Sequence, residues 1–180
     1  MYGLVNKAIK EFTIIHFGNE VWEKTYKELE LSDTGFLSME NNPDELTFKI
    51  INHVCRLLDY PPTKFYEQIG EYFLGFSAEE GFEHLFELAG NTLPELLHNL
   101  NDLHFRVKML MPKLNPPRFE VSEETEHSLK LHYYSNRDGF NSFLIGALKG
   151  LVRRFGLDAT LTELPPVAPG EKCIISISWV

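Results

Sequence analysis

The stretch TLPELLHNLNDLHFRVKMLMPKLNPPRFEV, residues 92–121, decides the fold class of this chain. It opens with a Thr92–Glu95 capping pattern and then repeats leucine at helical spacing, which predicts one helix from residue 92 to about residue 110. Pro112 ends this helix, because proline disrupts a helix interior. Beyond the next prolines, Phe119 and Val121 alternate with polar residues, which predicts a short strand. A helical pattern therefore gives way to a strand pattern within one proline-rich segment.

The chain is helical before this stretch and mixed after it. Helical spacing of apolar residues dominates the N-terminal part, with breaks at Gly18 and Pro61. After the stretch the patterns predict, in order, a strand, a helix and two strands, at residues 128–134, 139–155, 159–164 and 173–179. We therefore expect a single α+β domain over residues 1–180. A helical subdomain, residues 1–112, precedes a subdomain of residues 117–180 with a four-stranded antiparallel sheet and one inserted helix.

The composition excludes several classes of protein. The 180 residues are 43% hydrophobic and include 14 phenylalanines, so we expect a folded core and not a disordered chain. A net charge of −9 repels phosphate, which argues against a nucleic-acid binder. No window is apolar enough for a membrane span, and no signal peptide is visible. Because Cys55 and Cys173 are typical of buried thiols in a reduced compartment, we expect a soluble, cytoplasmic protein.

His104 is the histidine whose position most suggests a function. It lies inside the apolar stripe of the predicted helix, between Leu100 and Val107. One interpretation is a core histidine that is hydrogen-bonded to backbone or water. The other is an axial ligand to haem iron, because neutral imidazole is the usual protein ligand there. We expect the other histidines to be surface residues or residues with ordinary hydrogen-bond partners: His16, His53, His84, His98, His127 and His132.

A second group of polar residues follows the strand at residues 128–134. Tyr133, Ser135 and Arg137 alternate, so they share one face if the strand continues. All three can donate hydrogen bonds to oxygen, and arginine prefers carboxylate or phosphate. The group therefore suits an anion with two separated carboxylates, such as haem. The alternative is a polar strand end that runs into a turn.

Several motifs occur in order along the whole chain. They are MYGLVNKAI (1–9), GEYFLGFSAEEGF (70–82), NLNDLH (99–104), LNPPRFE (114–120), YYSNR (133–137) and the glycine pair Gly146 and Gly150. With these motifs the chain resembles the H-NOX family, the haem-nitric oxide/oxygen-binding domains. That family includes bacterial stand-alone members and the haem domain of soluble guanylate cyclase. No single motif is specific, but their joint occurrence at family spacing is.

The resemblance implies a role for each candidate residue. Haem b, iron protoporphyrin IX, would lie in the cleft between the two subdomains. His104 would be the axial ligand to the iron, and Pro117 would press on the macrocycle and distort it. The propionates would bind Tyr133, Ser135 and Arg137. The distal pocket would be walled by Val5, Phe73, Leu74, Phe143 and Leu144.

The resemblance also bears on which gas is bound. Family members that bind oxygen stably have a distal tyrosine whose hydroxyl donates to the ligand. In this chain that position falls on Ser142 or Phe143, depending on how the preceding turn is aligned, and residues 139–146 contain no tyrosine. We therefore expect a sensor selective for nitric oxide (NO), which also binds CO. An O₂ sensor is the alternative if Ser142 or Asn141 faces the iron.

The implied mechanism is signalling without catalysis. NO would bind five-coordinate ferrous haem, weaken the bond between iron and His104, and shift the helical part against the sheet. No output module follows in the chain, so the resemblance implies a partner in trans, a histidine kinase or a cyclic-di-GMP enzyme. Two alternatives are a haem enzyme, which would need distal acid–base groups, and an apolar small-molecule binder without haem.

Overall fold

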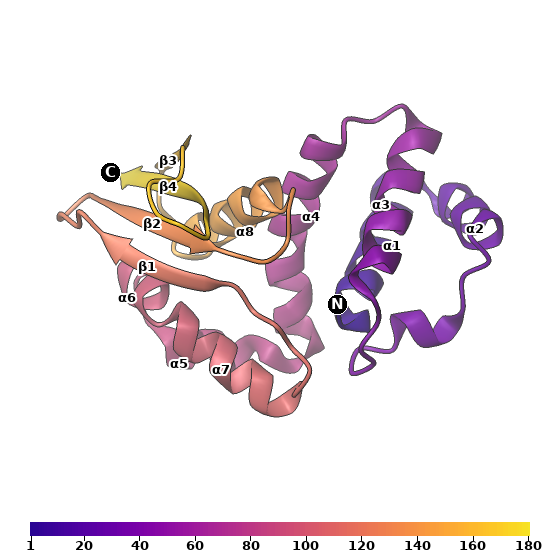
Figure 1. Ribbon diagram of the computed structural model, residues 1–180, viewed down its shortest axis with the longest axis horizontal. Helices are drawn as coiled ribbons and strands as arrows, with labels where there is room; N and C mark the ends of the chain where they lie inside the picture. Colours follow the sequence, from indigo (N-terminus) through magenta and orange to yellow (C-terminus); the bar gives the residue numbers. More distant parts are fainter.

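A computed structural model describes every residue of the chain, 1–180 (Figure 1). The helical elements are α1 (Gly3–Phe17), α2 (Asn19–Glu28), η1 (Asp33–Phe36), α3 (Asp44–Leu58), α4 (Pro62–Ser77), η2 (Ala78–Phe82), α5 (Glu83–Ala89), α6 (Leu93–His98), α7 (Leu100–Leu110) and α8 (Asn141–Arg154). The strands are β1 (Arg118–Ser122), β2 (Ser128–Tyr134), β3 (Ala159–Leu164) and β4 (Glu171–Trp179). The predicted α+β fold, with one helix inserted in a four-stranded antiparallel sheet, is confirmed.

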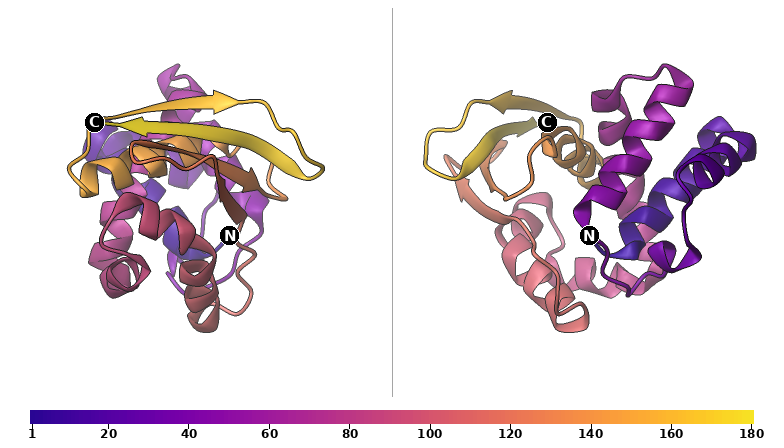
Figure 2. Two further views of the ribbon diagram at one scale, coloured as in Figure 1. Left: turned by 90° about the vertical axis from the view of Figure 1, so that its left-hand side faces the viewer. Right: turned by 45° about the vertical axis from the view of Figure 1, so that its right-hand side comes forward.

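The sheet has the strand order β1-β2-β4-β3, and every neighbouring pair is antiparallel. Strands β1 and β3 are therefore its edges. Along β2 the side chains alternate, with Leu129, Leu131 and Tyr133 buried and the residues between them half-buried. The buried face lies over α8 and over the helices α5 to α7 (Figure 2). The other face has no helix over it.

The single helix predicted for residues 92 to 110 is wrong in one respect, because the helix breaks at Asn99. The backbone of Asn99 leaves helical geometry, with φ −93° and ψ 7°, and separates α6 from α7. The Asn99 side chain donates a hydrogen bond of 2.8 Å to the carbonyl of Ala89, which holds the break against the end of α5. The leucine stripe is thereby divided between α6 and α7.

The helices α4 and α8 pack with their backbones in direct contact. A Cβ atom added at Gly70 would overlap the carbonyl of Phe143, and one added at Gly146 would overlap the carbonyl of Glu67. Only glycine permits so close an approach. Helix α8 thus lies between α4 and the sheet, and joins the N-terminal helices to the rest of the molecule (Figure 1).

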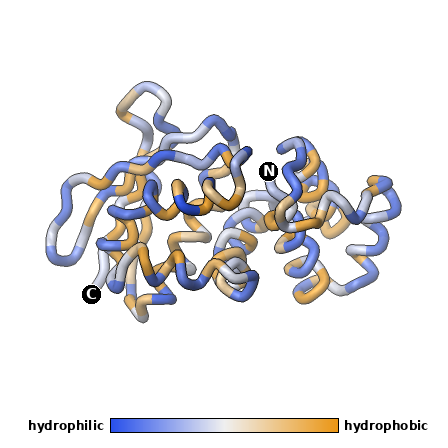
Figure 3. Tube along the Cα trace, turned by 90° about the horizontal axis from the view of Figure 1, so that it is seen from below, coloured by the Kyte–Doolittle hydropathy of each residue, from blue (hydrophilic) through white to orange (hydrophobic).

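Apolar side chains form two main clusters, one on each side of this contact. One cluster is built from α1 to α4 and includes Phe12 and Phe65, and the other from α5 to α8 and the sheet. Apolar and polar stretches alternate along the elements, as amphipathic packing requires (Figure 3). None of the helices combines the length and apolar character of a membrane span. Whether residues 112–117 separate two subdomains stays a prediction, because packing alone does not test independent folding.

Replacing Gly146 by alanine tests the contact between α4 and α8. We expect Gly146→Ala to lower the free energy of unfolding by about 1–3 kcal/mol, because the added methyl forces the helices apart. Gly75→Ala in α4 is the matched control, since Gly75 is exposed and a Cβ there meets nothing within 4 Å. That control should be neutral or stabilising by about 0.5–1 kcal/mol. Denaturant unfolding measures both, and equal effects would contradict the close contact.

Candidate functional site

A cavity of about 270 Å³ lies among α1, α4, α7, α8 and the first two strands. Of the 29 residues that line it, 23 are hydrophobic, so it suits a ligand with large apolar surfaces. The polar groups on its wall are few and include His104 and Arg137. Helices α7 and α8 bound this space. The break at Asn99 marks where α7 begins, and the contact with α4 positions α8.

His104 enters the cavity wall from α7, and its ring nitrogen Nδ1 is buried with no hydrogen-bond partner. The imidazole stacks on Phe119, with 5.8 Å between ring centroids. Burial lowers the pKa of His104 to about 4, so the ring is neutral at pH 7 and keeps a lone pair. A hydrogen-bonded core histidine would require a partner for Nδ1, and the structure provides none.

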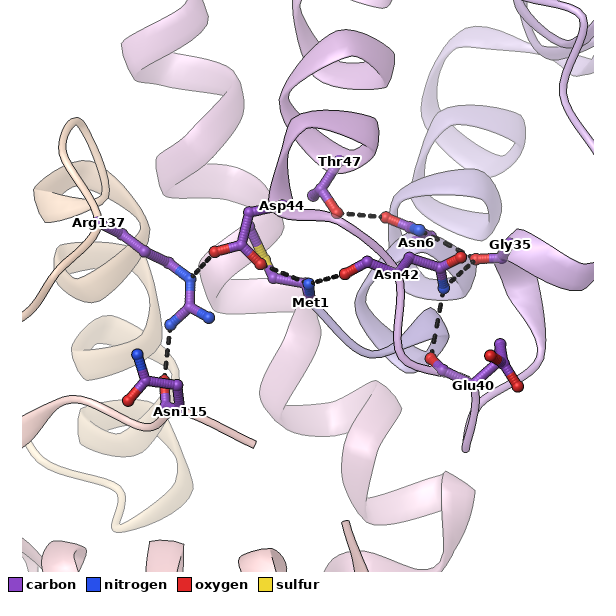
Figure 4. A network of polar contacts seen from close by, with 9 residues as sticks. All are labelled: Met1, Asn6, Gly35, Glu40, Asn42, Asp44, Thr47, Asn115 and Arg137. Carbon is purple, nitrogen blue, oxygen red and sulfur yellow. Dashed lines mark hydrogen bonds and ion pairs between the residues drawn. The ribbon is translucent and has the colours of Figure 1, made fainter. Parts of the chain in front are cut away.

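Arg137 lies at the rim of the cavity and holds three separate segments together (Figure 4). Its Nε donates a hydrogen bond of 2.6 Å to Asp44 Oδ2, and its Nη1 donates one of 2.8 Å to the Asn115 carbonyl. Asp44 also pairs with the amino group of Met1, which donates to the Asn42 carbonyl at 2.5 Å. The guanidinium therefore already binds a carboxylate at the edge of the cavity.

The other two residues predicted to hold carboxylates differ in their placement. Tyr133 lines the cavity, and burial raises the pKa of its phenol, which stays a hydrogen-bond donor at neutral pH. Ser135 does not line the cavity, and its hydroxyl accepts a hydrogen bond of 3.0 Å from the backbone N–H of Arg137. The structure thus brings Tyr133 and Arg137 together on the wall, while Ser135 shapes the turn that presents Arg137.

The residues predicted for the distal wall and for contact with the macrocycle all line this cavity. They are Val5, Phe73, Leu74, Phe143, Leu144 and Pro117. Of the two residues that could occupy the distal position, Phe143 lines the cavity and Ser142 does not. Asn141 is turned away, since its amide donates to Glu163 at 2.7 Å. A further hydroxyl on the wall, that of Ser77, donates to the Leu74 carbonyl at 2.9 Å.

Two polar residues that position the site from outside the cavity were not predicted from the sequence. Asp44 pairs with Arg137, 93 positions away, and no local pattern marks that pairing. Asn101 joins α7 to β1, because its amide donates 2.8 Å to the Phe119 carbonyl and its carbonyl accepts 2.9 Å from the Phe119 N–H. This double hydrogen bond fixes the helix of His104 against the strand that follows Pro117.

These residues fit a haem group. An apolar wall suits the faces of the macrocycle, a neutral imidazole with an unpartnered nitrogen suits the iron, and an arginine at the rim suits carboxylates. No group of three or more histidine, cysteine, aspartate or glutamate side chains in the chain could hold a metal ion by itself. One histidine in an apolar cavity is consistent with iron that a macrocycle also coordinates.

Comparisons with known proteins agree with this fit. The sequence pattern of the family described as Haem-NO-binding matches residues 2–163. The soluble guanylate cyclases gcy-35 and gcy-32 of Caenorhabditis elegans are 25% and 27% identical to the chain, over 86% and 89% of its length. Those matches cover 23% and 24% of the two cyclases, so the chain spans about a quarter of these curated relatives.

Solved structures share the fold. An Fe(II) unliganded H-NOX protein from K. algicida has a TM-score of 0.85 at 20% identity, covering 100% of this chain and 97% of that one. An H-NOX protein from S. oneidensis in the Fe(II)NO state has a TM-score of 0.86 at 16% identity, covering 100% and 99%. At these identities the likeness concerns the fold alone.

The role of His104 can be tested by removing its imidazole. We expect His104→Gly to bind haem with a native ferrous spectrum only when free imidazole is added, because the cavity then regains a neutral ligand. His98→Gly is the matched control, since His98 is exposed on α6 and pairs with Glu124 at 2.7 Å. Absorption spectroscopy measures both. A native spectrum of His104→Gly without imidazole would assign the iron to another residue.

The pair of Asp44 and Arg137 should make stability depend on pH. Burial alone would raise the pKa of Asp44, but hydrogen bonds from the Met1 ammonium and Arg137 hold it below its ordinary 3.8. Its contribution is therefore present above pH 3.8 and is lost as pH falls through the lower, folded-state pKa. We expect Asp44→Asn to cost about 1 kcal/mol of unfolding free energy at pH 7.

The pH series provides the check on that expectation. Unfolding free energies of the native chain and Asp44→Asn should converge as the pH is lowered below 3.8. Asp138→Asn is the control, because Asp138 is 91% exposed and its pair with Lys172 is solvated. It should leave the unfolding free energy nearly unchanged. A constant difference between native and Asp44→Asn at every pH would contradict the assigned charge interaction.

Proposed function

Because the chain belongs to the Haem-NO-binding family and is a haem gas-sensing domain, we propose that it senses NO selectively and excludes O₂. The observation that supports this selectivity is that Phe143 lines the cavity and that residues 139–146 contribute no tyrosine to its wall. CO should bind as well, since it needs no hydrogen bond from the protein. Bound haem b would supply ferrous iron as the site where the gas binds.

The residues of the cavity have the following proposed roles. His104 would hold the haem iron, and its stacking on Phe119 keeps the imidazole in place. Tyr133 and Arg137 bind the propionates, and Ser135 positions the backbone of Arg137. Pro117, directly before β1, would press on the macrocycle. The apolar residues of α4 and α8 exclude water from the distal side.

Selectivity follows from the scarcity of free donors on the distal wall. Phe143 packs with Phe73 and Phe140 at centroid distances of 5.8 and 5.0 Å, which fills that wall with aromatic rings. The Ser77 hydroxyl already donates to a carbonyl. Bound O₂ particularly needs a hydrogen bond because it is polarised, whereas NO binds ferrous iron strongly without one. The wall therefore favours NO.

The signal would pass from His104 to the surface through α7 and the rim of the cavity. We propose that His104 would carry a change at the haem iron into α7, and that α7 and β1 would move together, since Asn101 ties them. Arg137 links that half to the N-terminal helices through Asp44 and Met1. The two states must differ in these contacts for the gas to shift their populations. A histidine kinase or cyclic-di-GMP enzyme is the proposed receiver of this change.

Introducing a hydroxyl at the distal position tests the proposed selectivity. We expect the native ferrous protein to form no stable oxygen complex in air but to bind NO and CO. Phe143→Tyr should acquire a stable oxygen complex, because its phenol can donate into the cavity. Ser142→Tyr is the control, since residue 142 does not line the cavity, and it should behave like the native chain.

Absorption spectra in air and under NO distinguish the outcomes. Stable oxygen bands in the native protein would overturn selectivity for NO while leaving haem binding intact. A Phe143→Tyr protein that binds haem but gains no oxygen complex would contradict the argument from the missing donor. Absence of a Soret band from the purified, haem-supplied native chain would contradict haem binding by this chain itself.

A further inference from the structure

Three polar side chains form a row across the face of the sheet that points away from the cavity. They are Ser122 on β1, His132 on β2 and Glu171 at the start of β4. Because side chains alternate along a strand, His132 points outward where its neighbour Tyr133 points into the cavity. The row is therefore separate from the proposed haem site and has no part in the function proposed above.

Glu171 is the fixed end of this row. Its side chain is fully buried, and Oε2 accepts hydrogen bonds of 2.6 and 3.2 Å from the backbone N–H groups of Val167 and Ala168. Burial alone would raise the pKa of this carboxyl, but the hydrogen bonds from Val167 and His132 lower it. Glu171 is thus an ionised acceptor at neutral pH, held rigidly by the turn between β3 and β4.

An ionised Glu171 determines which nitrogen of His132 carries the proton. Oε1 of Glu171 lies 2.6 Å from Nδ1 of His132, so Nδ1 must be the donor. In the neutral ring, Nε2 then has a lone pair, and it lies 2.6 Å from Oγ of Ser122. Ser122 therefore donates its hydroxyl proton to this nitrogen. The order is serine, histidine and carboxylate, the arrangement that activates a serine hydroxyl as a nucleophile.

The surroundings of Ser122 leave its hydroxyl accessible. Ser122 is half-buried at the end of β1, an edge strand with no neighbour on its other side. Its cross-strand partner is Lys130, whose ammonium lies 2.5 Å from the carboxylate of Glu123. Glu123, directly after the serine, has φ +47°, so the chain turns sharply away there.

We propose that Ser122 is an activated nucleophile that accepts acyl groups from small, activated carboxylic esters. The serine Oγ bonds to the carbonyl carbon while its proton passes to Nε2 of His132. The bond from that carbon to the leaving alcohol breaks, and the alcohol departs with the proton. Water then reacts in the same way, which releases the carboxylic acid and restores the hydroxyl of Ser122. Glu171 is a positioning residue, because it acts only through His132.

The open sheet face indicates the class of acyl donor. No helix covers this face, and the main cavity lies on the other side of the sheet. Binding energy from a pocket is therefore small, and reaction depends on a good leaving group and an unhindered carbonyl. Aryl esters of acetic acid meet both conditions, and p-nitrophenyl acetate is the probe of choice.

Site-resolved acetylation by p-nitrophenyl acetate tests the proposal on the full, haem-loaded chain. Mass spectrometry of peptides should show Ser122 acetylated on the order of 100-fold faster than Ser128, the gain expected from a general base. Ser128 is the matched control, because it is also half-buried on this sheet but its hydroxyl lies 2.8 Å from that of Thr125. His132→Gln should remove the advantage of Ser122. Equal rates at the two serines, or an unchanged rate at Ser122 in His132→Gln, would overturn the proposal.

Glu171 needs a readout that separates positioning from folding. A proton NMR signal at low field from the Nδ1–H of His132 should be present in the native chain and lost in Glu171→Gln, together with fast acetylation of Ser122. Thermal unfolding shows whether that variant is folded. Glu171→Asp should restore part of both signals if the carboxylate orients His132. Fast acetylation in folded Glu171→Gln would contradict the positioning role.

Discussion

The direct contact between the backbones of α4 and α8 is the constraint on which the rest of the molecule depends. Because neither Gly70 nor Gly146 has a side chain, the helices approach until carbonyl groups fill the space a Cβ would take. Helix α8 then lies against the sheet on its other side. The elements α1, α7 and the first two strands do not take part in this contact, and together with α4 and α8 they bound the cavity. The position of the cavity therefore depends on glycine at both of these residues.

The cavity combines a large apolar wall with few polar groups, and three of these groups have a definite state. His104 is neutral because it is buried, Tyr133 keeps its proton for the same reason, and Arg137 meets a carboxylate. In such a site the apolar area supplies affinity for a ligand, and the few polar groups fix the ligand's orientation. It also explains why so much of the interior is aromatic. The phenylalanines of α4 and α8 both close the distal wall and exclude donors from it.

Much of this arrangement could be predicted from the sequence, and the failures have physical causes. Periodicity identified the strands and the inserted helix, because amphipathic elements show their buried faces directly. It missed the break at Asn99, where a side-chain hydrogen bond to Ala89 interrupts an otherwise unbroken leucine pattern. It could not choose between Ser142 and Phe143, because the turn before α8 determines which of the two side chains faces the cavity. The pairing of Asp44 with Arg137 is invisible to any local pattern, since it exists only after the chain has folded.

Strand β2 has the cavity on one face and the row of Ser122, His132 and Glu171 on the other. Tyr133 points to the cavity and His132 to the open face, so the two environments differ by a single position in the sequence. A slip of one residue in the pairing of β2 would exchange them and place an imidazole in the cavity and a phenol beside Ser122. The turn at residues 123–127 therefore cannot tolerate an insertion or deletion that shifts this register. The length of this loop therefore determines which side chains of β2 face the cavity and which face solvent.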